Sequence, residues 1–241
     1  MKLNLLNITS IDFDFNYIEH FAKHYSQFDI DEWHIILQTN YNYSSTAARN
    51  KFKEFHPNTF FYYWEGEFWS TATGADGVKT KIDRFNEIIE KLEGFILLAD
   101  IDEFHLYPTE PKLLLERGIV GGMMHDRFKP GRSPGALKPD NIFEQFPIKD
   151  TFSLDILEVW QHKPCLFHNS YRLINSHELT LYNEKVDYPT DLEIAHFKWT
   201  DTTKMKLIKR VETYYQKAHW QESVKALKEI YNYEHPLKPS I

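Results

Sequence analysis

Residues 95–104 read FILLADIDEF, a run of five apolar residues followed at once by an acidic cluster. Gly94 precedes the run, and Asp100, Asp102 and Glu103 follow it. A continuous apolar run with such borders is typical of a strand that is buried on both faces of a parallel sheet. Ligands of open α/β sheets bind outside the carboxyl ends of the strands, so the acidic cluster lies where chemistry is expected.

The chain before this stretch alternates short apolar runs with amphipathic helical patterns. Three apolar runs predict strands, at residues 3–8, 33–37 and 59–64. Apolar residues three and four positions apart predict helices at residues 14–26 and 80–93. Capping hydroxyls at residues 44–46 predict a further helix that ends before Pro57. Repeated strand–helix–strand units predict an α/β sheet with helices on both faces.

The pattern changes after the acidic cluster. Residues 119–125 form a further predicted strand, and residues 128–150 are rich in Pro and Gly, which indicates a long loop or flap. Short strand-like segments fill residues 151–199, and a helical pattern returns from residue 200. We therefore expect one Rossmann-like α/β domain over residues 1–200, with a mostly parallel central sheet flanked by helices. Residues 201–241 are expected to form a C-terminal helical extension packed on the same domain.

Composition excludes several classes of protein. The chain has 241 residues and a formal charge of −7, from 28 Lys and Arg against 35 Asp and Glu, so binding of nucleic acid through a basic field is disfavoured. An apolar fraction of 42% is ample for a core, which excludes intrinsic disorder. Cys165 is the single cysteine and cannot form an internal disulfide. No apolar run is long enough to span a bilayer, and the N-terminus lacks signal-peptide features, so we expect a cytoplasmic protein.

The spacing of Asp100 and Asp102 favours a metal site. In an extended chain, residues two apart share one side, and two carboxylates facing one point repel each other unless a cation lies between them. Hard oxygen ligands select Mg²⁺ or Mn²⁺, which in turn binds the phosphate oxygens of a substrate. The alternative is a solvated turn, because Asp is common where strands end.

The acidic stretch resembles the D-x-D region of GT-A glycosyltransferases, especially the family-2-like and family-92-like groups whose motif reads D-x-D-E-F. Four further segments are similar to that pattern in the same order along the chain: GVKTKIDRFNEII (77–89), HDRF (125–128), EQFP (144–147) and IAHFK (194–198). The resemblance covers residues 1–200 and implies a GT-A-like domain that transfers a sugar from a nucleotide-sugar donor.

The resemblance implies that the donor diphosphate is held together with Mn²⁺ or Mg²⁺. Asp102 would be the direct carboxylate ligand, Asp100 would face the ribose or reach the metal through water, and His196 would complete the coordination sphere. Such a metal neutralises the charge that develops on the departing nucleoside diphosphate. For His196 the alternative is a packed side chain beside Phe197 and Trp199.

Three cationic residues near the start of the helix 80–93 are candidates to bind the diphosphate: Lys79, Lys81 and Arg84. Because the helix dipole disfavours cations at this end, their presence is informative. The alternative is a solvated helix face.

An inverting sugar transfer needs a carboxylate that takes the proton of the acceptor hydroxyl. Asp126 follows the predicted strand 119–125 and Glu144 follows the Pro- and Gly-rich segment, so both are candidate catalytic bases. Arg127 beside Asp126 indicates either a tuned base or a structural ion pair. A retaining reaction would need neither base.

The acceptor is expected to be a glycan, a lipid-linked saccharide or another hydroxyl compound. Four basic residues in the C-terminal helical segment indicate either a solvated helix face or a peripheral contact with an anionic membrane: Lys204, Lys206, Lys209 and Arg210. Two other functions stay open. One is a non-catalytic module that binds a nucleotide sugar or a glycan. The other is a D-x-D phosphatase, although three strand–helix units precede the motif here and Phe104 occupies the position where such phosphatases have Thr or Val.

Overall fold

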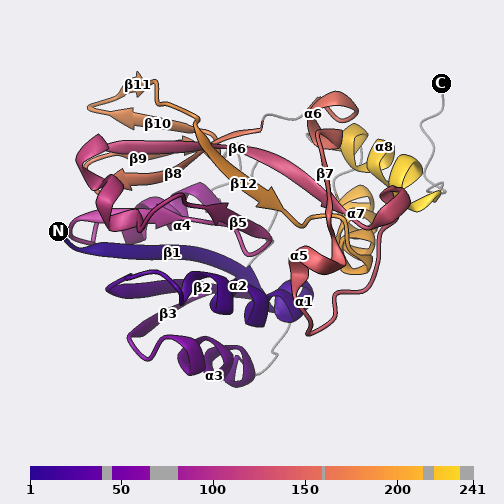
Figure 1. The fold of residues 1–241 in the computed structure, drawn as a ribbon, viewed down its shortest axis with the longest axis horizontal. Coiled ribbons are helices and arrows are strands. Elements are labelled where there is room, and N and C mark those ends of the chain that lie inside the picture. Colours follow the sequence, from indigo (N-terminus) through magenta and orange to yellow (C-terminus); the bar gives the residue numbers. More distant parts are fainter. Residues whose placement is uncertain (40–44, 66–80, 159–160, 214–219, 234–241) are drawn as a thin grey trace. The chain divides into compact units, whose positions relative to one another are not determined.

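Four parallel strands form one half of the central sheet in the computed structural model, which describes residues 1–39, 45–65, 81–158, 161–213 and 220–233 (Figure 1). Their order is β3-β2-β1-β4, and all three neighbouring pairs are parallel. Every residue of β1 and β4 is buried, as expected for strands covered on both faces. The bounds of the four strands are β1 Leu3–Ser10, β2 Glu32–Thr39, β3 Thr59–Glu65 and β4 Phe95–Leu98.

Beyond β4 the sheet continues in the order β8-β6-β12-β5, and β7 pairs with β6. This part of the sheet is antiparallel in four of its strand pairs: β4–β8, β8–β6, β12–β5 and β6–β7. The bounds are β5 Glu103–Leu106, β6 Ile119–Phe128, β7 Ile148–Asp150, β8 His162–His168 and β12 Leu192–His196. The acidic stretch therefore links β4, in the middle of the sheet, to β5 at its end.

The remaining elements are helices and a second, three-stranded sheet in the order β11-β10-β9. Its strands are β9 Arg172–Asn175, β10 Glu178–Leu181 and β11 Glu184–Val186. The α-helices are α1 Ile11–Asp14, α2 Ile18–Tyr25, α3 Thr46–Phe55, α4 Lys81–Ile89, α5 Ile142–Gln145, α6 Phe152–Asp155, α7 Asp201–Thr213 and α8 Trp220–Tyr231. The 3-10 helices are η1 Phe15–Tyr17, η2 Pro111–Arg117 and η3 Pro130–Arg132.

The predicted α/β class is confirmed, with parallel central strands, flanking helices and a C-terminal helical segment. Two local expectations are wrong. Residues 14–26 do not form one helix: they hold the last residue of α1, then η1 and α2. The predicted loop at 128–150 contains α5 and β7, because the long strand β6 offers residues 126–128 for pairing with 148–150.

The chain folds into two compact units. The first comprises Met1–His125 and Gln161–His196, and the second comprises Asp126–Trp160 and Phe197–Ile241. The predicted boundary after residue 200 stays a prediction. Among the described helices, none has the length and apolar character that a membrane span requires.

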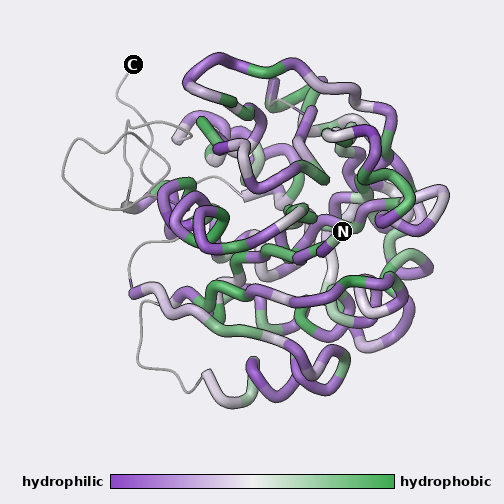
Figure 2. Tube along the Cα trace, turned by 90° about the vertical axis from the view of Figure 1, so that its left-hand side faces the viewer, coloured by the Kyte–Doolittle hydropathy of each residue, from purple (hydrophilic) through white to green (hydrophobic). Residues whose placement is uncertain are grey.

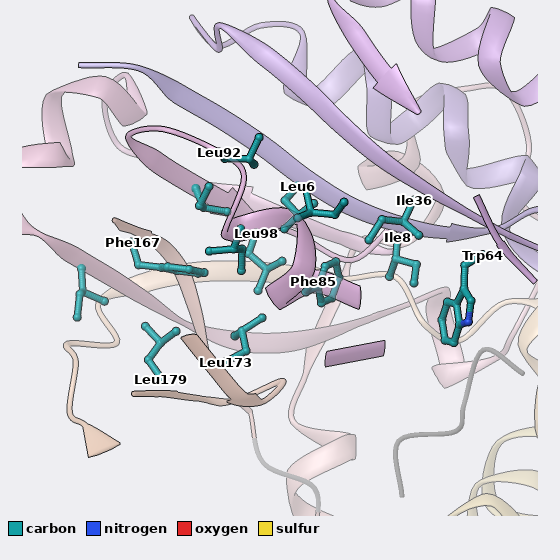
Figure 3. Close-up of a cluster of buried hydrophobic side chains, with 14 residues drawn as sticks. Leu6, Ile8, Ile36, Trp64, Phe85, Leu92, Leu98, Phe167, Leu173 and Leu179 are labelled. Atoms are coloured by element: carbon teal, nitrogen blue, oxygen red, sulfur yellow. The ribbon is translucent and has the colours of Figure 1, made fainter. Parts of the chain in front are cut away.

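Each unit has its own hydrophobic core. In the first unit, side chains from β1, β2, β4, α4, β8 and the small sheet meet in one cluster, which includes Leu6, Phe85, Leu98, Phe167 and Leu173 (Figure 3). Burying one such side chain contributes about 1.5–3 kcal/mol. The tube coloured by hydropathy shows hydrophobic segments alternating with hydrophilic ones along the helices, as expected for helices that cover a core with one face (Figure 2).

Helix α4 is fixed within this first unit by polar contacts as well as by its apolar face. Asn86 donates from Nδ2 to the carbonyl oxygen of Leu173 and accepts the Leu173 N–H at Oδ1, both at 2.9 Å. The side-chain amide of Asn86 thus pairs with the backbone of Leu173 as a neighbouring strand would, at the free edge of β9. This pairing sets the position of α4, whose first residue is Lys81.

The core of the second unit is aromatic at its centre. Phe128 and Trp199 stack with 6.1 Å between ring centroids, and Phe152 meets Trp199 edge-on at 5.3 Å. Apolar residues of α7 and α8, among them Leu207 and Leu227, complete the cluster. The predicted C-terminal helices therefore bury their apolar faces in this unit.

Candidate active site

The acidic stretch forms a tight turn directly after β4. The Glu103 N–H donates to the carbonyl oxygen of Asp100 at 3.0 Å, and the Asp100 N–H donates to Oε2 of Glu103 at 3.1 Å. The expectation that Asp100 and Asp102 lie in an extended segment is therefore wrong. The reason is that β5, which starts at Glu103, pairs with β12 at the end of the sheet, so the chain must leave the line of β4.

Two lysines bind the Asp100 carboxylate. Lys81 Nζ, from the first turn of α4, donates to Oδ1 at 2.6 Å, and Lys163 Nζ, from β8, donates to Oδ2 at 2.7 Å. Burial alone would raise the pKa of Asp100, but the ammonium groups of Lys163 and Lys81 outweigh it and hold the pKa well below its usual range. Asp100 is therefore ionised at every pH at which the protein would work.

Lys163 also binds Glu103, with 2.6 and 2.7 Å from Nζ to the two carboxylate oxygens. Both side chains are only 3–4% exposed, so this is a buried ion pair. Burial would lower the pKa of Lys163, yet the carboxylates of Asp100 and Glu103 raise it above its usual value. For Glu103 burial dominates and raises the pKa, which the Lys163 ammonium offsets in part.

Asp102 and His196 approach each other although 94 positions separate them in the sequence. The antiparallel register of β5 and β12 places His196 opposite Glu103, next to the acidic turn. His196 Nε2 lies 3.7 Å from Oδ2 of Asp102, and the two side chains are 12% and 19% exposed. The structure thus brings together the two residues that were predicted to bind the metal directly.

Asp102 and His196 suit a divalent cation as a partial ligand set. Among the residues that the structure describes, no three His, Cys, Asp or Glu side chains are arranged to hold a metal on their own. Mg²⁺ and Mn²⁺, however, are commonly bound through one or two protein ligands together with substrate phosphates. One carboxylate oxygen and one imidazole nitrogen at the surface of the turn fit that mode of binding.

The other predicted donor contacts differ in their placement. Lys81 reaches the acidic turn, as described above. Arg84 is bonded along its own helix, where NH1 lies 3.0 Å from Oε2 of Glu87. Lys79 falls outside the described residues, so its predicted role stays a prediction.

The two candidate bases lie in the second unit and differ in environment. Asp126 is 1% exposed and accepts three hydrogen bonds, from Ser153 N at 2.6 Å, Ser153 Oγ at 2.9 Å and Trp199 Nε1 at 2.9 Å. Glu144 is exposed in the first turn of α5 and accepts a bond from Asn141 Nδ2 at 3.2 Å. Asp126 thus has the surroundings of an anchoring carboxylate, whereas Glu144 is accessible to solvent.

Lys163 was not predicted from the sequence. Its strand reads HKPCLFH, and five of the seven residues are buried. A lysine within a buried strand is the feature of the sequence that could have indicated a functional role. A buried lysine requires a partner of opposite charge. Nothing in the sequence alone indicates that this partner lies some 60 residues earlier.

No family model matches the sequence, and no curated protein matches it. Solved structures that resemble the chain include S. aureus TarS, with 11% identity over 96% of this chain and 43% of that one, at a TM-score of 0.41. The galactosyltransferase LgtC, in complex with donor and acceptor sugar analogues, gives 13% identity over 50% of this chain and 46% of that one, at a TM-score of 0.35. The mannosyltransferase PcManGT from Pyrobaculum calidifontis, in complex with GDP-Man and Mn²⁺, gives 12% identity over 88% and 61%, at a TM-score of 0.40.

The chain spans less than half the length of TarS and of LgtC. A 1–349 fragment of TarS, solved with UDP-GlcNAc, has 10% identity and a TM-score of 0.42. All these TM-scores lie below 0.5. The α/β fold class is therefore assigned from the strands and helices of this chain itself.

Proposed function

We propose that this protein is a metal-dependent glycosyltransferase that moves a sugar from a nucleoside-diphosphate sugar to a hydroxyl acceptor. The observation that carries the proposal is the 3.7 Å approach of His196, at the end of β12, to Asp102, on the acidic turn that follows β4. This is the place in an α/β sheet where ligands bind. The acceptor we propose is a glycan, a lipid-linked saccharide or another hydroxyl compound.

Asp102 and His196 are the residues that would hold Mn²⁺ or Mg²⁺ in this proposal. A bound divalent cation supplies positive charge against the nucleoside diphosphate as the sugar leaves. Lys81 adds a second positive charge near the same turn, since its ammonium already lies 2.6 Å from Asp100. The protein's own contribution is to fix these charges before the donor arrives, so little reorganisation accompanies the transfer.

Asp126 and Glu144 stay the proposed catalytic bases for an inverting transfer. A base must accept a proton from the acceptor, so its carboxylate needs contact with that hydroxyl. The exposure of Glu144 supports this role for it, whereas the three hydrogen bonds to Asp126 support an anchoring role. The two roles predict different effects of substitution: loss of turnover for a base, and loss of stability for an anchoring carboxylate.

The proposal is tested by release of nucleoside diphosphate from a panel of nucleotide sugars, starting with UDP-GlcNAc and GDP-Man, with Mn²⁺ or with a chelator. We expect one donor to be hydrolysed slowly with Mn²⁺ and hardly at all with the chelator. Asp102→Asn should lower that rate by at least about 100-fold, as loss of a charge-stabilising group does. Asp187→Asn, an exposed carboxylate on the same unit, should leave it unchanged.

Two results would contradict the proposal. Full Mn²⁺-dependent release by Asp102→Asn would exclude the metal role of this residue. Tight binding of a nucleotide sugar with no release, even after long incubation with acceptors, would instead identify a non-catalytic binding module.

A further inference from the structure

Lys163 satisfies all its hydrogen-bonding capacity inside the acidic turn. An ammonium group has three N–H donors and no acceptor. The three acceptors are Oδ2 of Asp100 at 2.7 Å and the two carboxylate oxygens of Glu103 at 2.6 and 2.7 Å. Because Lys163 comes from β8 and the carboxylates from the turn after β4, the contact fixes the turn against its neighbouring strand.

Stability alone does not account for this cluster. Removing a lysine and a glutamate from water carries a large desolvation cost. A protein with well-packed apolar side chains at such positions is often at least as stable. What a hydrogen-bonded buried pair does supply is a defined position for each carboxylate. Here that position leaves both oxygens of Asp100 bound to ammonium groups, one of Lys81 and one of Lys163.

Among the four side chains joined by the contacts described here, the charges balance without a metal ion. Two ammonium groups, of Lys81 and Lys163, face two carboxylates, of Asp100 and Glu103. A divalent cation that bound Asp100 would have to displace an ammonium group or lie close to two of them, and like charges at short range in a partly buried site repel strongly. Asp102 instead faces His196, a neighbour that can itself bind a metal.

We propose that Lys163 is a positioning residue that holds the Asp100 carboxylate away from the cation and leaves Asp102 and His196 as the ligands of the metal. The proposal rests on the proposed metal-dependent function. In it, Asp100 acts as the counter-ion that holds Lys81 and Lys163, and the D-x-D pair contributes one metal ligand. Lys163 contacts neither the donor nor the metal and acts through the two carboxylates.

The test is Mn²⁺ affinity, measured by titration of the purified protein with Mn²⁺ alone and with Mn²⁺ plus UDP or GDP. Asp100→Asn, which is nearly isosteric, should leave the affinity within about threefold of wild type. Asp102→Asn should weaken it by at least about 10-fold, because loss of even a hydrogen-bond partner of a metal ligand typically costs 10- to 100-fold. Either result is obtained without any assay of activity.

Lys163→Met tests the positioning role directly. Removing the ammonium frees Asp100 to meet a cation, so we expect Mn²⁺ to bind at least about threefold more tightly, and addition of Asp100→Asn to abolish that gain. A merely structural lysine would lower thermal stability without such coupling between the two positions. Lys149→Met, an exposed lysine on β7, is the matched control and should change neither quantity.

The outcomes separate this proposal from the function on which it rests. Weakening of Mn²⁺ binding by Asp100→Asn to the same extent as by Asp102→Asn would overturn the proposal and leave the metal-dependent function intact. A wild-type protein that binds no Mn²⁺, with or without UDP or GDP, would overturn both. Should Lys163→Met fail to fold, Lys163→Gln, which keeps an N–H donor and loses the charge, takes its place in the same titration. An unchanged Mn²⁺ affinity in a folded Lys163 variant would overturn the proposal.

Discussion

His24 lies on α2 with its imidazole between aromatic rings, 5.6 Å from the ring centroid of Phe28 and 5.0 Å from that of Phe104. Its Nε2–H donates to the carbonyl oxygen of His105 at 3.0 Å. Burial lowers the pKa of His24 to about 4, which the bond to His105 offsets only in part. The residue is therefore neutral in the folded protein at pH 7.

This environment makes stability depend on pH. The folded-state pKa of about 4 lies below the ordinary value of 6.5, so in the unfolded chain the imidazole binds a proton at a higher pH. The contribution of His24 is present above pH 6.5 and is lost as the pH falls from 6.5 to 4, to a total of about 3 kcal/mol. Urea unfolding at pH 7 and at pH 4, compared between wild type and a variant at position 24, measures this loss.

His24→Gln keeps an N–H donor for the carbonyl oxygen of His105 and cannot be protonated. We expect it to lose less stability than wild type between pH 7 and pH 4. His162→Gln, at an exposed position in β8, is the control and should behave as wild type. An equal loss in wild type and in His24→Gln would contradict the account.

At the same residue scale, the candidate site shows what a sequence can and cannot indicate. Asp102 and His196 were predicted because a strand end and a family pattern point to them, and the register of β5 and β12 brings them to 3.7 Å. Lys163 was missed because its role depends on which strand lies beside β4. That neighbour, β8, is set by pairing between segments some 70 residues apart, which local patterns do not encode.

Asp126 connects three elements of the second unit. It lies on β6, and its carboxylate accepts bonds from Ser153 at the start of α6 and from Trp199, which stacks on Phe128 in the aromatic core. A buried carboxylate with three donors is well satisfied. Its loss would leave those donors unpaired.

We therefore predict that Asp126→Asn destabilises the protein by about 1–3 kcal/mol, because an amide cannot accept bonds at both positions and one buried donor loses its partner. Glu144→Gln, at an exposed position, should change stability by less than about 0.5 kcal/mol. Chemical unfolding measures both effects. Donor turnover by the same variants then separates the bases: the catalytic base is the one whose loss lowers kcat in protein that is still folded.

Loss of turnover in Glu144→Gln with normal stability would assign the base to Glu144. Normal stability of Asp126→Asn together with loss of turnover would contradict the anchoring role and assign the base to Asp126. Neither residue would affect kcat in a retaining transfer.

Across the whole molecule, the strands β1 to β4 and the helices α3 and α4 could be predicted from the sequence, because each is a local pattern with clear ends. The sheet order after β4 was not predicted, since β8, β6 and β12 join the sheet by antiparallel pairing that depends on distant partners. The strand β7 could not be predicted within 128–150, because it has only three residues and the Pro and Gly residues before it are typical of a loop.

The central claim is that the acidic turn binds a nucleoside diphosphate together with a divalent cation. Thermal unfolding with UDP, GDP, ADP and CDP, each with and without Mn²⁺, tests it most directly. A ligand at 100 times its dissociation constant adds about 2.7 kcal/mol to the free energy of unfolding, which for a chain of this length raises Tm by about 5–10 °C. We predict such a rise for wild type with one nucleotide and Mn²⁺ together, and its loss in Asp102→Asn. No rise with any nucleotide, or an undiminished rise in Asp102→Asn, would contradict the claim.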